Sequence, residues 1–229
     1  MANYPALFLF DLDKTLVSSG GGHKASFAEA FKKVYGVDTT IDIINYHGMT
    51  EQQIIRRVMK MKGISEKTIE AKLKQCMRQM VVTYNQLLKT SEKVVVLKGV
   101  RKLLKTLNEK GVLIGAVTGN LEGIAKGKLR KVGLLYYFKV GGFGSDHSER
   151  VELIRIAIKQ AKKLGFTPKD NVYLFGDTPK DIVAGKKAEI ITVGIASGIY
   201  STQQLKHAGA VYVFSDLRDT GSVASLLVK

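Results

Sequence analysis

The sequence predicts an α/β protein that has a mostly parallel sheet and an all-helical segment inserted after the first strand. Residues 6–10 form an apolar run that is long enough for a buried strand and too short for a helix. From about residue 94 to the end, short apolar runs alternate with amphipathic segments, a pattern typical of a parallel sheet covered on both faces. Between these parts, residues 23–89 carry apolar side chains at helical spacing. We therefore assign residues 1–17 and 94–229 to an α/β core and residues 18–93 to a helical insert.

The individual elements follow from the same periodicities. In the insert we expect helices at residues 25–35, 54–61 and 69–88, with a connection at 37–48 and hinges at 17–22 and 90–97. In the core we expect, in chain order, helix 99–110, strand 112–117, helix 121–132, strand 138–141, helix 149–164, strand 172–175, helix 179–188, strands 190–193 and 211–214, and helix 216–227.

Composition narrows the class of protein. The chain has 229 residues, 45% of them hydrophobic, and a formal charge of +16. The basic residues are dispersed as short pairs, as on solvated helix faces, and aromatic residues are not interleaved with them, so we do not expect nucleic acid as a partner. No apolar run approaches the roughly 18 residues that cross a bilayer, and the single cysteine, Cys76, fits a reducing compartment. We expect a cytoplasmic protein, monomeric or homodimeric, that does not bind membranes.

Two acids stand at the end of the first predicted strand. Asp11 and Asp13 are spaced i, i+2, which places both on one side of an extended chain. Neighbouring carboxylates repel each other and lose solvation, so they require a compensating cation, and Mg²⁺ prefers such oxygen ligands. The stretch therefore predicts a metal-dependent site.

Two further strand ends carry polar residues. Thr118-Gly119-Asn120 follows the strand at 112–117, and Asp177 and Asp181 follow the strand at 172–175. Each group alone would be an ordinary turn or helix cap. Because the carboxyl ends of parallel strands meet at one edge of a sheet, their joint occurrence points to a shared site.

These residues resemble the motifs of the haloacid dehalogenase-like hydrolase superfamily, in the group of phosphoglycolate phosphatase-like enzymes with a helical cap (C1-type) after the first strand. Asp11-Leu12-Asp13-Lys14-Thr15 matches the Asp-x-Asp-x-Thr signature, Thr118 the second motif, and Gly176-Asp177 through Asp181 the fourth. The resemblance covers nearly the whole chain. It implies a Rossmann-like core, a cap formed by the insert, and phosphate chemistry rather than dehalogenation.

The resemblance also implies a role for each motif residue. Asp11 would attack phosphorus and form an aspartyl-phosphate, and Asp13 would act as general acid and then general base. Mg²⁺ would be held by Asp11, the backbone carbonyl of Asp13 and Asp177, with Asp181 holding a metal-bound water or a nearby cation. Thr118 and the backbone amides around Gly119 and Asn120 would hold the phosphoryl oxygens.

The third motif, a lysine or arginine that balances the carboxylates, departs from its commonest form. The Lys-Pro pair frequent in this cap class is absent, and Arg150 at the start of the next helix is our first choice. Lys128 on the preceding helix is the alternative, and both could be exposed helix charges. Lys14 also departs from the pattern, since it replaces a glycine that is often found between Asp13 and the threonine.

Substrate specificity is expected to come from the cap. His47 and Thr50 flank a glycine between two predicted cap helices and are candidates for substrate contacts, although Thr50 could instead cap the following helix. The resulting expectation is Mg²⁺-dependent hydrolysis of a small phosphate monoester, with phosphoglycolate as an example. The alternatives are a sugar phosphomutase of the same fold and a basic nucleic-acid-binding protein on an inactive scaffold.

Overall fold

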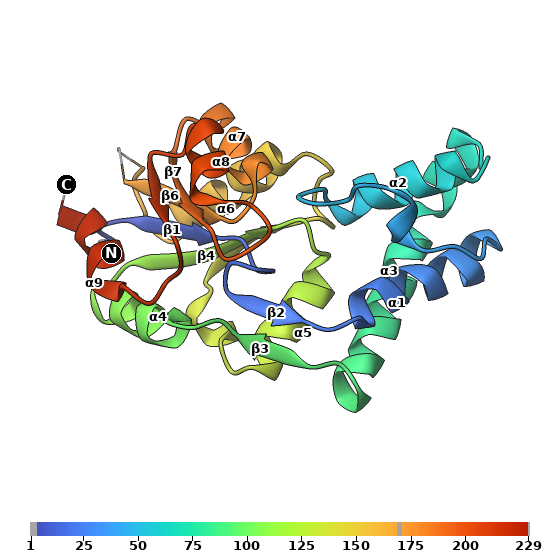
Figure 1. Ribbon diagram of the computed structural model, residues 1–229, viewed down its shortest axis with the longest axis horizontal. Coiled ribbons are helices and arrows are strands. Elements are labelled where there is room, and N and C mark those ends of the chain that lie inside the picture. The colour runs from blue at the N-terminus through green and yellow to red at the C-terminus, as the bar shows by residue number, and fades with distance from the viewer. Residues whose placement is uncertain (1–3, 169–170, 229) are drawn as a thin grey trace.

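A parallel sheet of six strands forms the centre of the protein in the computed structural model, which describes residues 4–168 and 171–228 (Figure 1). The strands lie in the order β5-β4-β1-β6-β7-β8, and every neighbouring pair is parallel. They are β1 (Leu7–Phe10), β4 (Leu113–Thr118), β5 (Val140–Phe143), β6 (Val172–Gly176), β7 (Ile191–Ile195) and β8 (Tyr212–Phe214). All four residues of β1 are buried, which explains why this strand is an unbroken apolar run.

Helices cover both faces of the sheet. The alternation of side chains along β1 sends Phe8 and Phe10 to one face and Leu7 and Leu9 to the other. The helices of the α/β part are α4 (Val100–Glu109), α5 (Glu122–Lys131), α6 (Arg150–Lys163), α7 (Pro179–Lys187), α8 (Thr202–His207) and α9 (Thr220–Ala224). Side chains of α4, α5 and α9 pack on the phenylalanine face, and those of α6 and α7 pack on the leucine face.

The insert is a helical unit with its own apolar core, and it lies beside the sheet rather than on it (Figure 1). It comprises α1 (Gly22–Ala30) with a π-helical turn at Phe31–Tyr35, a 3₁₀ turn at Ile41–Ile43, α2 (Glu51–Met61) and α3 (Glu66–Thr90). Cys76 is buried in this core as a free thiol. Leu121, the N-cap residue of α5, and Ile124 also join it, so the insert is seated on the start of that helix.

The two segments that connect the insert to the sheet pair with each other. β2 (Val17–Ser19) and β3 (Val94–Val96) form a two-stranded antiparallel ribbon. Both fall within the predicted hinges at 17–22 and 90–97, where no strand was expected. The predicted domain limits run through this ribbon, and they stay a prediction.

The predicted fold class is confirmed, and the differences are local. Helix α8 was not predicted, and the final helix expected at 216–227 consists of the short α9 followed by a 3₁₀ turn at Ser225–Val228. Helix α1 begins at Gly22, the last residue of the hinge predicted at 17–22. None of the described helices combines the length and hydropathy that a membrane span requires.

Candidate active site

The loops that follow β1, β4 and β6 meet at the carboxyl edge of the sheet, where they line a cavity of about 320 Å³. These three strands are neighbours in the sheet. Asp11 and Asp13 come from the first loop, Thr118, Gly119 and Asn120 from the second, and Asp177 from the third. The insert supplies the opposite wall, so the cavity is lined by both parts of the chain.

Three carboxylates converge at the floor of this cavity. Asp11, Asp177 and Asp181 are all buried, and each offers an oxygen atom within 4.8 Å of the others. Asp181 is held by the start of α7, where its Oδ2 accepts hydrogen bonds from the backbone N–H (3.0 Å) and the hydroxyl (2.6 Å) of Thr178. Its Oδ1 is buried and accepts no hydrogen bond. The backbone at Gly198 approaches so closely that a Cβ there would lie 1.9 Å from Asp177 Oδ2.

The raised pKa values of two of these acids reflect their burial and the repulsion between neighbouring carboxylates. Burial and the neighbouring charge of Asp181 raise the pKa of Asp11 to about 7. Burial and the charges of Asp11 and Asp181 raise the pKa of Asp177 to about 8. Three buried carboxylates cannot easily all be ionised at the same time. A hard divalent cation bound to their oxygen atoms would stabilise the ionised forms.

Arg150 is the basic residue of this carboxylate cluster. It is the first residue of α6, and its guanidinium Nη1 lies 2.7 Å from Asp181 Oδ1 and 3.3 Å from Asp11 Oδ1. The side chain is 10% exposed and also lines the cavity. Burial lowers the pKa of Arg150, but the carboxylates of Asp181 and Asp11 outweigh it and keep the guanidinium charged.

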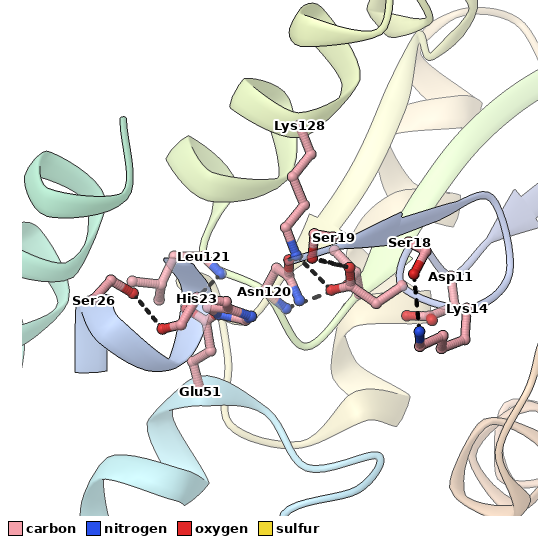
Figure 2. Close-up of polar contacts among 12 residues, drawn as sticks. Asp11, Lys14, Ser18, Ser19, His23, Ser26, Glu51, Asn120, Leu121 and Lys128 are labelled. Atoms are coloured by element: carbon pink, nitrogen blue, oxygen red, sulfur yellow. Dashed lines mark hydrogen bonds and ion pairs between the residues drawn. The ribbon is translucent and has the colours of Figure 1, made fainter. Parts of the chain in front are cut away.

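Lys128 lies on the other side of the site and is fully buried. Its ammonium donates to both oxygens of Asp13, at 2.8 and 2.6 Å, and to Asn120 Oδ1 at 2.7 Å (Figure 2). Burial raises the pKa of Asp13, but Lys128 more than offsets this effect, so the pKa is below its ordinary value. The two candidates for the third motif thus both reach the site, and they contact different carboxylates.

The loop after β4 is compact and in contact with the insert. Thr118 is buried, and its Oγ1 accepts a hydrogen bond from the backbone N–H of Asn120 at 3.3 Å. A Cβ at Gly119 would lie 2.6 Å from the backbone oxygen of Met49, so only glycine fits beneath the loop of the insert. A phosphate-binding role for this loop stays a prediction.

The first turn of α2 attaches the insert to the loops of the site. Hydrogen bonds run from the backbone N–H of Glu51 to the oxygen of Gly119 (2.9 Å), from Gln52 Nε2 to the oxygen of Gly144 (2.8 Å), and from Gln53 Nε2 to Glu149 Oε1 (3.0 Å). Three consecutive residues, 51–53, therefore hold the insert against the loops that follow β4 and β5.

The two specificity candidates of the insert differ in position. His47 is exposed, lines the cavity and packs on the ring of Tyr46, with centroids 4.9 Å apart. Thr50 is buried and is not among the cavity-lining residues. Its hydroxyl caps α2 and donates to the oxygen of Ser148 at 2.8 Å, which corresponds to the capping role considered as its alternative. A substrate contact by Thr50 stays a prediction.

His23 and Glu51 line the cavity and were not predicted. His23 Nε2 lies 2.5 Å from Glu51 Oε1, and Glu51 Oε2 accepts from the backbone N–H of Leu121 at 3.0 Å (Figure 2). A buried glutamate one residue after a helix cap leaves no signal in the sequence. Its pairing with a histidine 28 residues earlier depends on how α1 and α2 pack.

Comparison with known proteins defines the class. The model of the haloacid dehalogenase-like hydrolase family matches residues 8–195, so the chain belongs to this family. Pyrophosphatase PpaX of Oceanobacillus iheyensis is 23% identical over 219 residues, 92% of each chain. Phosphoglycolate phosphatase of Pseudomonas fluorescens is 24% identical over 221 residues, 93% of this chain and 78% of that one. The crystal structure of a hydrolase from Pseudomonas syringae has the same fold, with a TM-score of 0.71 and 24% identity over 96% of this chain and 98% of that one.

Proposed function

We propose that this protein is a Mg²⁺-dependent phosphoric monoester hydrolase that acts on a small phosphorylated metabolite. The observation that carries the proposal is the buried cluster of Asp11, Asp177 and Asp181 at a cavity that the sheet and the helical insert both line. The cluster supplies a nucleophile and oxygen donors at one place. Family membership supports hydrolysis, and the paired acids support phosphate as the group that is transferred.

Asp11 is the proposed nucleophile. A carboxylate oxygen of Asp11 forms a bond to phosphorus while the bond from phosphorus to the leaving oxygen breaks, which gives an aspartyl-phosphate. Attack by water on this phosphorus then releases inorganic phosphate and restores the carboxylate. Arg150 beside Asp11 provides fixed positive charge for the phosphoryl oxygens, and its forked geometry suits that task.

Asp13 is the proposed general acid and base. It protonates the departing alkoxide in the first step and removes a proton from the attacking water in the second. Lys128 holds the Asp13 carboxylate and the loop after β4 in one orientation, because its ammonium donates to both Asp13 and Asn120. Lys128 itself is not among the residues that line the cavity, which fits a positioning role.

The residues present fit a bound Mg²⁺. Asp11 and Asp177 would hold the ion together with the backbone carbonyl of Asp13, and Asp181 would accept a hydrogen bond from a ligand water through its buried Oδ1, which is ion-paired with Arg150 and accepts no hydrogen bond. When bound, the ion would supply charge neutralisation between the attacking carboxylate and the anionic phosphate.

The remaining contacts are assigned to substrate binding. Thr118 with the backbone amides near Gly119 and Asn120 would hold phosphoryl oxygens, and His47 at the cavity wall would contact the leaving group. A cavity of about 320 Å³ suits a metabolite of modest size. The names of the two curated relatives, a phosphoglycolate phosphatase and a pyrophosphatase, suggest a small anionic substrate.

A screen of phosphorylated metabolites with Mg²⁺ tests the proposal, with Asp11→Asn as the blank. We expect Mg²⁺-dependent release of phosphate by the wild-type protein and loss of that release in the variant. Release of phosphate without an isomerised product separates a phosphatase from a phosphomutase. Activity no higher than the blank across the whole screen would reject the proposal.

Replacing His47 by alanine tests its contact with the leaving group. We expect kcat/KM to change by different factors for different substrates. His47 lies on the cavity wall formed by the insert, where it would contact the leaving group, and the leaving group differs between substrates. Equal activity of variant and wild type on every accepted substrate would remove His47 from the binding site.

A further inference from the structure

Lys14 has a backbone conformation that a lysine rarely adopts. Its φ is +66°, in the left-handed region that favours glycine, and it is one of two described non-glycine residues with positive φ. The conformation is held by hydrogen bonds to both backbone polar groups of Lys14. The Lys14 N–H donates to the oxygen of Val17 at 2.7 Å, and the hydroxyl of Ser197 donates to the Lys14 oxygen. The turn would thus exist with glycine at this position, and the lysine adds strain to it.

The residue at this strained position lines the active-site cavity. Lys14 lines the cavity together with Asp11 and Asp13, and the side chain is exposed. Its ammonium donates to Ser18 Oγ at 2.9 Å, a contact that Figure 2 shows at the loop after β1. A serine hydroxyl is a neutral partner and does not balance the charge.

The other basic groups of the cavity wall are already paired. Arg150 faces Asp11 and Asp181, and Lys24 lies 2.6 Å from Asp42. Within residues 4–168 and 171–228, Lys14 has no carboxylate within 4.0 Å. Among the lysines and arginines that line the cavity in this part of the chain, Lys14 is therefore the one whose charge is available to a ligand.

We propose that Lys14 is a specificity-determining residue that binds a second anionic group, a carboxylate or phosphate, on the leaving group of the substrate. This inference rests on the proposed phosphatase function and narrows its substrate class to phosphate monoesters with an anionic leaving group. The strain at φ +66° is kept because the lysine side chain is needed at this point of the cavity wall.

Two variants separate the charge of Lys14 from its backbone strain. Lys14→Gln removes the charge and keeps a side chain at positive φ, whereas Lys14→Gly removes both. Glu189, the other described non-glycine residue with positive φ, is not among the cavity-lining residues. Glu189→Gly is therefore the matched control, since it relieves similar strain away from the site.

The substrate pair is 2-phosphoglycolate, whose leaving group carries a carboxylate, and 2-hydroxyethyl phosphate, in which a neutral group replaces it. We expect the ratio of kcat/KM for these two substrates to fall about 10- to 100-fold in both Lys14 variants, the size of a lost charge-assisted hydrogen bond. Lys14→Gly and Glu189→Gly should each raise Tm by about 1–4 °C, because the left-handed region no longer holds a side chain. Glu189→Gly should leave the ratio unchanged.

Binding measured without turnover distinguishes failure of this inference from failure of the proposed function. In the Asp11→Asn background with Mg²⁺, calorimetry should show that Lys14→Gln weakens 2-phosphoglycolate binding about 10- to 100-fold and affects 2-hydroxyethyl phosphate much less. Wild-type activity with an unchanged substrate ratio in both Lys14 variants would overturn the role of Lys14 and leave the phosphatase intact. Equal weakening of both ligands, or binding of neither, would also overturn it.

Discussion

Replacing Asp177 by asparagine tests whether the carboxylate cluster stores repulsion that a cation relieves. Burial and the charges of Asp11 and Asp181 raise the pKa of Asp177 from 3.8 to about 8. In this range the folded, metal-free protein binds more protons than the unfolded chain. The contribution of Asp177 to stability should therefore be greatest at low pH and should fall as pH rises from about 4 towards 8. Asparagine has nearly the same shape and no titrating charge, so it removes this loss.

The size of the effect follows from the shift. One pKa unit corresponds to about 1.4 kcal/mol, and Asp11, whose pKa is raised to about 7, titrates in the same range. Because the neighbouring acids share protons, we expect Asp177→Asn to gain about 1–3 kcal/mol in free energy of unfolding at pH 8 without metal, and less at pH 5. For a chain of 229 residues this corresponds to a rise in Tm of about 2–10 °C.

Thermal unfolding at pH 5 and pH 8, in EDTA and in Mg²⁺, measures the prediction. The wild-type protein should gain stability from Mg²⁺ at pH 8, and the variant should gain little while losing activity. Asp38→Asn is the control, because this carboxylate is 86% exposed and lies 3.6 Å from Lys32. A variant that is less stable than wild type in EDTA at pH 8 would refute the reasoning, since it would show that contacts within the protein already satisfy Asp177.

Two further substitutions test how the site is held together. Lys128→Met removes the partner of Asp13, so the pKa of Asp13 should rise and the limb of the pH–rate profile that it controls should move to higher pH. The free energy of unfolding should fall by about 1–3 kcal/mol, less than for a wholly buried pair because Asp13 is 31% exposed. Lys126→Met, on the exposed face of the same helix, should do neither. Gly119→Ala would place a Cβ 2.6 Å from the backbone oxygen of the loop before α2, so we expect kcat/KM to fall at least about 10-fold. Gly21→Ala, where a Cβ meets nothing within 4 Å, should be near neutral, and similar activities of the two alanine variants would contradict the close fit.

The ends of the strands could be predicted from the sequence because a run of buried apolar residues is followed directly by polar or acidic ones. β1 is apolar up to Phe10 and is followed at once by two acids, so the sequence marks both the strand and the edge of the sheet. The ribbon of β2 and β3 was missed because each strand has only three residues, and their pairing joins segments about 75 residues apart. Helix α8 was missed because, of its six residues, only Leu205 is buried, which is too little to give a periodic pattern.

Within the site, residue types were easier to predict than contacts. Asp11, Asp13 and Asp177 are recognisable because acids after buried strands are unusual. The contact between Lys128 and Asp13 spans 115 residues, and a helix rich in lysine gives no sign that one of them is fully buried. The sequence did mark Lys14 as unusual, because it stands where the family motif often has a glycine. Its positive φ became visible only in the structure.

The balance of charge explains why two basic residues are needed in this site. Arg150 lies between Asp11 and Asp181, and Lys128 contacts Asp13, whereas Asp177 has no basic group within 4.0 Å among the described residues. Among these four carboxylates and their two ion-paired basic residues, two negative charges are left over, and they are concentrated on the cluster that contains Asp11, the proposed nucleophile. A single divalent ion there would complete the balance before an anionic phosphate enters. With only one of the two basic residues, the ion would leave the site negative and would not offset its repulsion of the substrate. Arg150 and Lys128 are therefore not alternatives for one role, and we expect each to be required.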